Sequence, residues 1–266
     1  MQLQYFDIHS HLNFSHFDED REDIIEKMQK EGVFTVTIGT DKKTSLEAIE
    51  LAEKHDNLYA TIGVHPTAED SWDREYFEKL LNTSKKIIGI GECGLDYYRI
   101  PNTHEKENSR IKHEQKKIFI EQLEFAKEKS LPVVFHMRSK AGNMDAHLDT
   151  LEVLQNYKGD IRGDFHFCTS DVDIAKAFLD LGHFLSFDGP ITFAREYEAV
   201  IKMTPLDRIM AETDAPFAAP EPYRGKRNNP LYVKEVYKKI AEIKKIDFDE
   251  CQQILNKNAK TFWLLK

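Results

Sequence analysis

The sequence predicts an α/β fold in which residues 1–266 form a single domain, a (β/α)8 barrel. Short apolar segments alternate with amphipathic helical segments along the whole chain, without repeats or long linkers. This alternation favours a parallel sheet covered by helices. About eight such units in 266 residues fit a closed barrel better than an open sheet. Polar residues also gather at the ends of the apolar segments, where the strands of a barrel turn into loops.

The predicted strands are short and apolar, and they cover residues 5–9, 33–38, 58–62, 87–91, 133–136, 161–167, 184–187 and 208–212. Apolar residues at helical spacing, such as Ile174, Phe178 and Leu181, predict helices between the strands. Examples of these helices are residues 21–30, 45–55, 74–81, 113–129 and 172–181. Residues 232–243 and 251–265 are the expected closing helices.

The composition predicts a cytoplasmic protein. Mean hydropathy is −0.55, and no apolar run approaches the roughly 20 residues of a membrane span. The first residues lack the basic and apolar regions of a signal peptide. The cysteines Cys93, Cys168 and Cys251 are scattered and form no Cys-x-x-Cys pair, which is typical of a reducing compartment.

The formal net charge of −9 excludes a protein that coats nucleic acid by charge alone. An enzyme that acts on nucleic acid remains compatible with this charge if its positive potential is local or is supplied by bound metal. The sequence leaves the oligomeric state open.

Titratable side chains follow the predicted strands at one end of the barrel. They are His9, His11, His65, Glu92, His136, Arg138, His166, Glu212 and Asp214. In a (β/α)8 barrel the carboxyl ends of the strands form one face, and active sites lie there. Residues two apart on a strand point the same way, so we expect His9 and His11 to face the barrel axis together.

This set of residues predicts a site for one or two divalent metal ions. His9, His11, Glu92 and Asp214, together with histidines from strands five and six, offer nitrogen and oxygen donors suited to Zn²⁺, Mn²⁺ or Mg²⁺. Glu92 has two oxygens and could bridge two ions. A lone His-x-His pair indicates little, and the prediction depends on six candidates meeting at one end of the barrel. We expect Asp7 one layer deeper on the same face, as a supporting residue.

Several other motifs have structural interpretations. The segment from Gly89 to Gly94 matches the dinucleotide fingerprint G-x-G-x-x-G, but a loop follows it instead of a helix, so we expect no nucleotide cofactor. Its glycines are expected to allow close backbone approach. Cys93 and Cys168 lack an oriented base and are expected to be small buried residues. Six further histidines are expected to be structural or solvent-exposed: His16, His55, His104, His113, His147 and His183.

The chain resembles the TatD-type metal-dependent deoxyribonucleases of the amidohydrolase-like superfamily. The matching segments run in order from residue 7 to residue 230, and they are DIHSHL, GVHP, GIGECGLDYY, PVVFHMR, ETDAPF and YRGKRNNP. The resemblance implies a (β/α)8 barrel, a divalent-metal centre and phosphodiester cleavage on DNA. By motif, it implies the metal ligands His9, His11, Glu92, His136, His166 and Asp214.

Two segments depart from the family pattern. After His166 the usual turn glycine is missing and Asp171 is present, and Ser139-Lys140-Ala141 follows Arg138. The first departure leaves the fit of substrate at that loop open.

The functional hypothesis is a 3′–5′ exonuclease acting on single-stranded DNA. Asp214 would accept the proton of the attacking water, assisted by Glu212, while His65 and Arg138 would contact the scissile phosphate. Basic residues past strand eight could hold the nucleic-acid backbone, and aromatic residues past strand four could stack on bases. These residues are Arg224, Lys226, Arg227, Tyr97 and Tyr98. The alternatives are a solvated loop for the basic residues and internal packing for the two tyrosines.

Three other functions stay open at this stage. A metal-dependent hydrolase of small amides or esters would use the same barrel, although Glu92 stands where many amidases of the superfamily have a bridging lysine. A hydrolase of aminoacyl-tRNA esters would attack a carbonyl at the same site. A non-enzymatic metal module is disfavoured because structural sites are usually closed and rich in sulfur.

Overall fold

The computed structural model describes residues 2–101 and 104–266, and it has the predicted fold class. Among these residues, eight parallel strands form one sheet in the order β1 to β8. The strands are β1 (Tyr5–Ser10), β2 (Val33–Thr37), β3 (Leu58–Ile62), β4 (Ile87–Asp96), β5 (Val133–Arg138), β6 (Gly163–Phe165), β7 (Phe184–Phe187) and β8 (Ile209–Ala211). Neighbouring strands in the sheet are therefore also neighbours along the chain, as in a (β/α)8 barrel.

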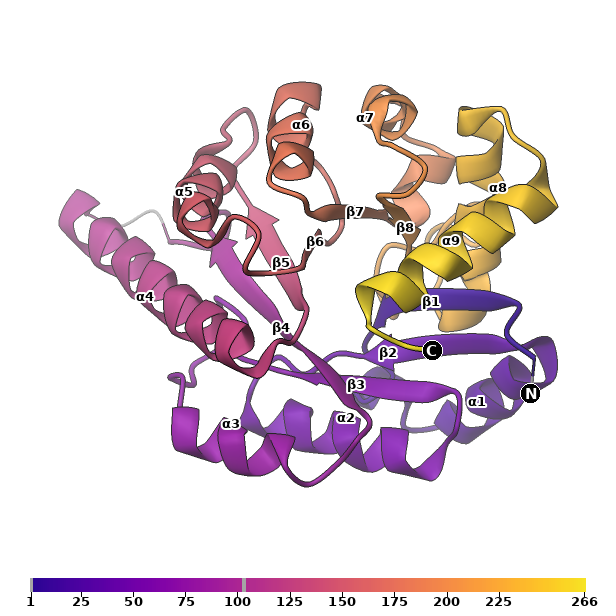
Figure 1. The fold of residues 1–266 in the computed structure, drawn as a ribbon, viewed down its shortest axis with the longest axis horizontal. Coiled ribbons are helices and arrows are strands. Elements are labelled where there is room, and N and C mark those ends of the chain that lie inside the picture. Colours follow the sequence, from indigo (N-terminus) through magenta and orange to yellow (C-terminus); the bar gives the residue numbers. More distant parts are fainter. Residues whose placement is uncertain (1, 102–103) are drawn as a thin grey trace.

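Helices surround the strands as an outer ring (Figure 1). They are α1 (Arg21–Glu31), α2 (Lys42–Lys54), α3 (Arg74–Leu81), α4 (Glu105–Lys129), α5 (Asp145–Leu154), α6 (Val172–Asp180), α7 (Glu198–Met203), α8 (Val233–Lys244) and α9 (Phe248–Phe262). Aspartates at the N-caps of α2, α3, α6 and α9 accept hydrogen bonds from the first backbone N–H groups. No helix of the described residues is both long and apolar enough to cross a membrane.

The barrel closes between β1 and the segment that follows β8. The backbone N–H of Asp214 donates to the carbonyl of His9 at 3.0 Å, and the N–H of His11 donates to the carbonyl of Ala215 at 2.7 Å. Ser10 and Ala215 form the parallel bridge between these segments. The residues that complete the barrel therefore also bring three predicted metal ligands together.

Two of the three apolar cores of the described residues lie on the two sides of the strands. The largest core contains strand residues such as Phe135 and Leu185 together with the inward faces of the helices. The second core joins residues from six strands to two aromatic residues at the end of the chain: Phe6, Ile8, Val36, Ile38, Ile88, Val134, Phe184, Met210, Phe262 and Trp263. Because successive strand residues point to opposite faces, this second core fills the inside of the barrel.

Extra residues in two strands, β1 and β4, change which side chains face inward. Between Asp7 and Ser10, β1 advances three residues while β2 advances two, from Thr35 to Thr37. The strand β4 has extra residues against both of its neighbours, and the later one lies between Ile90 and Cys93. Such bulges change the direction in which side chains point. The two segments contain the predicted ligands His9 and Glu92.

The structure differs from the prediction at several boundaries. The helices α5 and α7 occupy gaps for which no helix bounds were predicted, and α4 starts at Glu105 instead of residue 113. The missed turns of α4 are highly charged and contain a single apolar residue, Ile111, so they show no hydrophobic periodicity. The strand β4 continues to Asp96, whereas β6 is limited to Gly163–Phe165.

Candidate metal centre

A cavity of about 770 Å³ opens at the carboxyl ends of the strands. It is lined by seven of the predicted site residues together with other polar and aromatic side chains. The seven are His11, His65, Glu92, His136, Arg138, His166 and Asp214. Its volume lies in the range of pockets that bind small ligands or single nucleotide units.

The two histidines of the first strand lie side by side. The Nε2 atoms of His9 and His11 are 3.2 Å apart, and the Nδ1 atoms have no hydrogen-bond partner among the described residues. Both residues are buried, and burial is the main cause that lowers the pKa of His9. A neutral imidazole is the form that binds metal.

The prediction that Asp7 lies on the same face as His9 is wrong, because the bulge in β1 separates the two side chains. The Asp7 carboxylate instead accepts hydrogen bonds from the Thr35 hydroxyl at 3.1 Å and from the Thr213 hydroxyl and backbone N–H at 2.8 Å. It also accepts from the backbone N–H of His9 at 3.3 Å. Asp7 thus connects the backbone segments that carry His9 and Asp214.

Glu92 lies at the centre of the cluster, with its two oxygens directed at different histidines. Oε2 is 3.6 Å from His9 Nε2 and 3.7 Å from His11 Nε2. Oε1 is 2.5 Å from His136 Nδ1 and 3.8 Å from His166 Nε2. Burial alone would raise the pKa of Glu92, but His136 and His65 outweigh burial and hold this pKa well below its ordinary value. Glu92 is therefore an ionised carboxylate placed between two sets of nitrogen donors.

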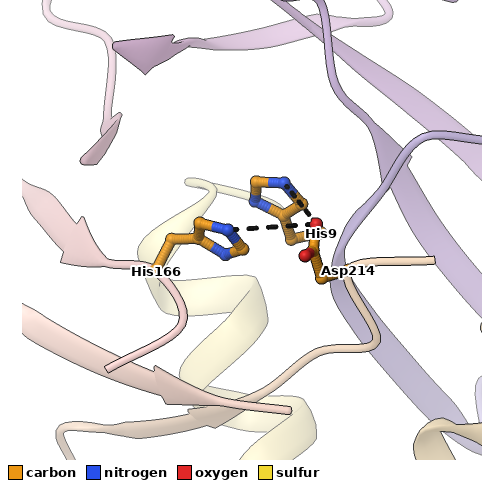
Figure 2. Close-up of side chains that lie close together, drawn as sticks. All are labelled: His9, His166 and Asp214. Atoms are coloured by element: carbon orange, nitrogen blue, oxygen red, sulfur yellow. Dashed lines mark ion pairs between the residues drawn. The ribbon is translucent and has the colours of Figure 1, made fainter. Parts of the chain in front are cut away.

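Asp214 faces the histidines of the cluster, and Figure 2 shows it beside His9 and His166. Its Oδ1 lies 3.7 Å from His9 Nε2, 3.4 Å from His11 Nε2 and 4.0 Å from His166 Nε2. Burial raises the pKa of Asp214, but the hydrogen bond to His11 and the charge of His166 outweigh it and keep the pKa below its ordinary value. Asp214 is therefore available as a carboxylate ligand or as a proton acceptor.

Glu212 orients His166 and does not face the cavity. Its Oε1 lies 2.7 Å from His166 Nδ1 and accepts from the backbone N–H of Phe167, and its Oε2 accepts from the Ser186 hydroxyl at 2.8 Å. With its oxygens engaged and the residue fully buried, Glu212 is not placed to act as a base toward substrate. It favours the histidine tautomer that leaves Nε2 free for a metal.

The structure adds Asp96, which the sequence analysis did not select. Its Oδ2 lies 3.2 Å from His136 Nε2, and its Oδ1 accepts from the backbone N–H of Arg99 at 2.9 Å. Asp96 was assigned to a loop, but it lies on β4 at alternate positions from Glu92 and therefore on the same face. Extending the predicted strand by five residues, from residue 91 to residue 96, would have found it.

The donor set fits divalent metal ions. Three groups of side chains place one donor atom each within 4.8 Å of one another: His9, His11 and Glu92; His9, His166 and Asp214; and His65, Glu92 and His136. Nitrogen and carboxylate donors of this kind suit Zn²⁺ or Mn²⁺. The first and third groups share only Glu92, so the arrangement has room for one ion or two.

The predicted substrate-binding residues lie in different environments. Arg138 lines the cavity, and its guanidinium lies 4.1 Å above the ring of Tyr98, which is 51% exposed. Tyr97 is buried and donates its hydroxyl to Asp149 at 2.7 Å, which agrees with the packing alternative and contradicts base stacking by its ring.

The basic loop past β8 lies outside the cavity lining. Arg224 packs over the ring of Phe193 at 4.0 Å. Arg227 pairs with the Asp20 carboxylate at 2.5 Å and caps the carbonyl of His16, so its charge is partly compensated within the protein. Lys226 is exposed. The structure therefore brings the metal candidates together but keeps these three residues apart from them.

The glycines of the G-x-G-x-x-G segment permit close packing, as predicted. A Cβ atom on Gly91 would lie 2.7 Å from the carbonyl oxygen of Val134, and one on Gly94 would lie 2.1 Å from that of His136. Both glycines lie within β4 and have positive φ angles, and neither opens a helix.

Comparison with known proteins identifies the family. A family model described as "TatD related DNase" matches residues 6–264. The chain belongs to this family. YabD of Bacillus subtilis, named as a metal-dependent hydrolase, is 38% identical over 266 residues, which cover 96% of this chain and 97% of YabD. A Pectobacterium parmentieri protein named 3′-5′ ssDNA/RNA exonuclease TatD is 32% identical, with 98% of this chain and 99% of that protein covered.

The barrel also matches a solved structure of the TatD family. The crystal structure of YjjV, a TatD homologue of Escherichia coli K12, has a TM-score of 0.88 and 26% identity, and the match covers both chains completely. The protein is therefore a metal-dependent hydrolase of the TatD family with a (β/α)8 barrel.

The two departures from the TatD pattern have local structural explanations. Asp171 is the N-cap of α6, where its side chain accepts from the backbone N–H of Ile174 at 2.9 Å. Ser139 accepts from the backbone N–H of Ala146 at 3.1 Å, and its hydroxyl lies 3.2 Å from His147 Nδ1. Both residues stabilise the starts of helices that follow the site.

Proposed function

We propose that the protein is a metal-dependent 3′–5′ exonuclease that removes nucleotides from single-stranded DNA. The main supporting observation is the placement of Glu92 between two sets of donors, His9 with His11 and His136 with His166. Ions of Mg²⁺, Mn²⁺ or Zn²⁺ held there, together with Asp214, would neutralise the phosphodiester, activate water and stabilise the leaving oxygen.

The charge distribution supports an anionic substrate. The chain carries a net charge of −9, yet Arg99 and Arg138 line the cavity. Positive groups at the mouth of a cleft act locally and do not require a basic surface. The relative from Pectobacterium parmentieri, whose name specifies a 3′-5′ ssDNA/RNA exonuclease, supports the polarity and the single-stranded substrate.

In the proposed mechanism, Asp214 accepts the proton of the attacking water, because its lowered pKa keeps it ionised near neutral pH. Glu212 holds His166 in position. When no ion occupies the group of His65, Glu92 and His136, His65 can donate a hydrogen bond from Nε2 to a phosphate oxygen, since its Nδ1 accepts from the backbone N–H of Thr67 at 3.1 Å. Burial, the largest cause, lowers the pKa of His65 to about 3, so this donor is neutral. Arg138 supplies positive charge beside the same phosphate.

The test uses single-stranded DNA labelled at its 5′ end or at its 3′ end. For 3′–5′ cleavage, the 5′-labelled strand gives a ladder of one-nucleotide steps, and the 3′-labelled strand releases labelled mononucleotide at once. The opposite pattern would reverse the polarity. No cleavage with any of the three metals, together with release of the amino acid from aminoacyl-tRNA or hydrolysis of a small ester, would replace the nuclease proposal by an ester hydrolase on the same barrel.

A further inference from the structure

An exposed phenylalanine stands at the edge of the metal centre. Phe217 is 46% exposed and lines the cavity. The rings of His11 and His16 meet it at interplanar angles of 66° and 73°, so they do not cover it by stacking. Phe14, which stacks on His11 with centroids 4.4 Å apart, extends the same aromatic surface along the cavity wall.

The position of Phe217 is fixed by its backbone. Its N–H donates to the carbonyl of Asp214 at 2.8 Å, and its carbonyl accepts from the buried Asn228 side chain at 2.7 Å. The same amide of Asn228 also donates to the carbonyl of Thr213. Gly189 packs so closely against the loop that a Cβ atom there would lie 2.0 Å from the carbonyl oxygen of Ala218. A large apolar ring is thus held in solvent by a rigid loop, which is the arrangement of a preformed contact for a ligand.

The charged side of the cavity lies opposite. Arg99 follows β4 and Phe217 follows β8, and strands four positions apart in an eight-stranded ring face each other across the barrel. The metal candidates lie between these two sides, and the ring centroid of His11 is 6.2 Å from that of Phe217. A nucleotide could therefore place its phosphate at the centre, its base against Phe217 and the rest of the strand toward the arginines.

We infer that Phe217 is the stacking platform for the base of the terminal nucleotide. This inference rests on the proposed exonuclease function and names the residue that recognises the strand end. A phenyl ring accepts any base by its face, so the platform would not discriminate between sequences. It requires a base that is free of its own duplex, which explains a preference for single strands.

The experiment compares two single-stranded oligonucleotides that differ only at the attacked end. One ends in an adenine nucleotide, and the other carries a tetrahydrofuran in place of the terminal base-bearing sugar. The measured quantity is kcat/KM for release of the terminal nucleotide. Wild type, Phe217→Ala and Phe217→Trp are compared with Leu148→Ala, which removes an exposed side chain on α5 that is 56% exposed and does not line the cavity.

For wild type, Phe217→Trp and the Leu148→Ala control, kcat/KM is expected to be at least about fivefold higher on the adenine-ended strand than on the tetrahydrofuran-ended strand. This factor is the lower bound for the stacking of one base. In Phe217→Ala, kcat/KM is expected to fall on the adenine-ended strand alone, so that the preference disappears. An unchanged preference in Phe217→Ala, or an equal loss on both substrates, would overturn the inference while leaving the exonuclease proposal intact. Failure of metal-loaded wild type to cut either strand would instead overturn the exonuclease proposal and the inference with it.

Discussion

The two ends of the barrel are built from the same strands and contain opposite chemistry. At the carboxyl ends, imidazole and carboxylate groups from β1, β4 and β5 and from the segments after β6 and β8 meet in a solvent-accessible cavity. Toward the amino ends, Phe6, Ile88 and Met210 pack with Phe262 and Trp263 from the end of the chain. Burying apolar groups is favourable, so the amino end of the barrel, its base, stabilises the fold. Burying ionisable groups is costly, so the carboxyl end, its mouth, lowers the stability of the fold.

The difference between the two ends depends on small departures from regular strands. A regular β1 would place His9 on the face opposite to Ile8, and the bulge between Asp7 and Ser10 brings the histidines to the inside. We therefore expect substitutions at the carboxyl end of the barrel to change catalysis with little effect on stability. Substitutions at the amino end are expected to change stability with little effect on catalysis.

The largest effect is expected for Asp214→Asn at the mouth. The variant keeps the size of the side chain but loses the proton acceptor, and kcat on single-stranded DNA should fall by about 10³-fold. Thermal unfolding should show a midpoint close to that of wild type. A variant that retains its activity would contradict the role of Asp214, even if metal still bound.

The next largest effect is expected at the base for Trp263→Ala. Trp263 is fully buried, and its loss should lower the free energy of unfolding by about 3–5 kcal/mol, measured by denaturant titration. Leu264→Ala is the matched control, because the neighbouring Leu264 is 56% exposed and its truncation should change stability little. Folded Trp263→Ala should retain kcat. A large loss of kcat in the folded variant would show that the two ends are coupled.

A smaller effect is expected for Glu212→Gln behind the metal centre. The amide can still accept from Ser186 or Phe167, but it no longer carries the charge that orients His166. Metal affinity or activity should fall about 10- to 100-fold, the usual cost of losing such a supporting carboxylate. Titration of the metal-free variant with Mn²⁺ measures the affinity directly, and wild-type affinity would contradict the positioning role.

The smallest effect concerns a histidine outside the metal centre. His183 precedes β7 and lies against the rings of Phe135 and Phe178, and its two imidazole nitrogens have no hydrogen-bond partner among the described residues. Burial lowers its pKa to about 4, below the value of about 6.5 in an unfolded chain. As the pH falls, the unfolded state therefore binds the proton before the folded state does. The stability that comes from keeping His183 neutral is complete above pH 6.5 and is lost as the pH falls toward 4.

Between pH 7 and pH 5, wild type should lose about 1–2 kcal/mol more unfolding free energy than His183→Gln. His113→Gln, which changes an exposed histidine on α4, serves as the control and should behave like wild type. Urea titrations at both pH values provide the measurement. Equal losses in wild type and His183→Gln would show that His183 is not buried as a neutral group.

The sequence predicted the order of strands and the convergence of the candidate ligands, because both follow from local patterns. Alternating apolar segments indicated the barrel, and residues at strand ends such as His136 and His166 meet in any barrel of this topology. The family resemblance agreed with these patterns, and the family match confirmed it.

What the sequence did not predict depends on contacts between distant segments. The bulge that separates Asp7 from His9 depends on pairing with β2, and no local pattern specifies it. Asp96 was not selected because the strand was predicted to end within the glycine-rich segment, whereas β4 continues through that segment to Asp96. Tyr97 carries no signal of its burial, since its partner Asp149 lies 52 residues away on α5, for which no bounds were predicted.

The most direct test of the central claim is DNA cleavage by metal-stripped protein before and after metal is returned. Wild type is treated with a chelator, dialysed and assayed on end-labelled single-stranded DNA while Mn²⁺ is added in measured equivalents. The claim predicts no cleavage without metal and recovery that saturates at one or two bound ions per chain. Undiminished cleavage by protein shown to contain no metal would contradict a metal-dependent reaction at the mouth of the barrel.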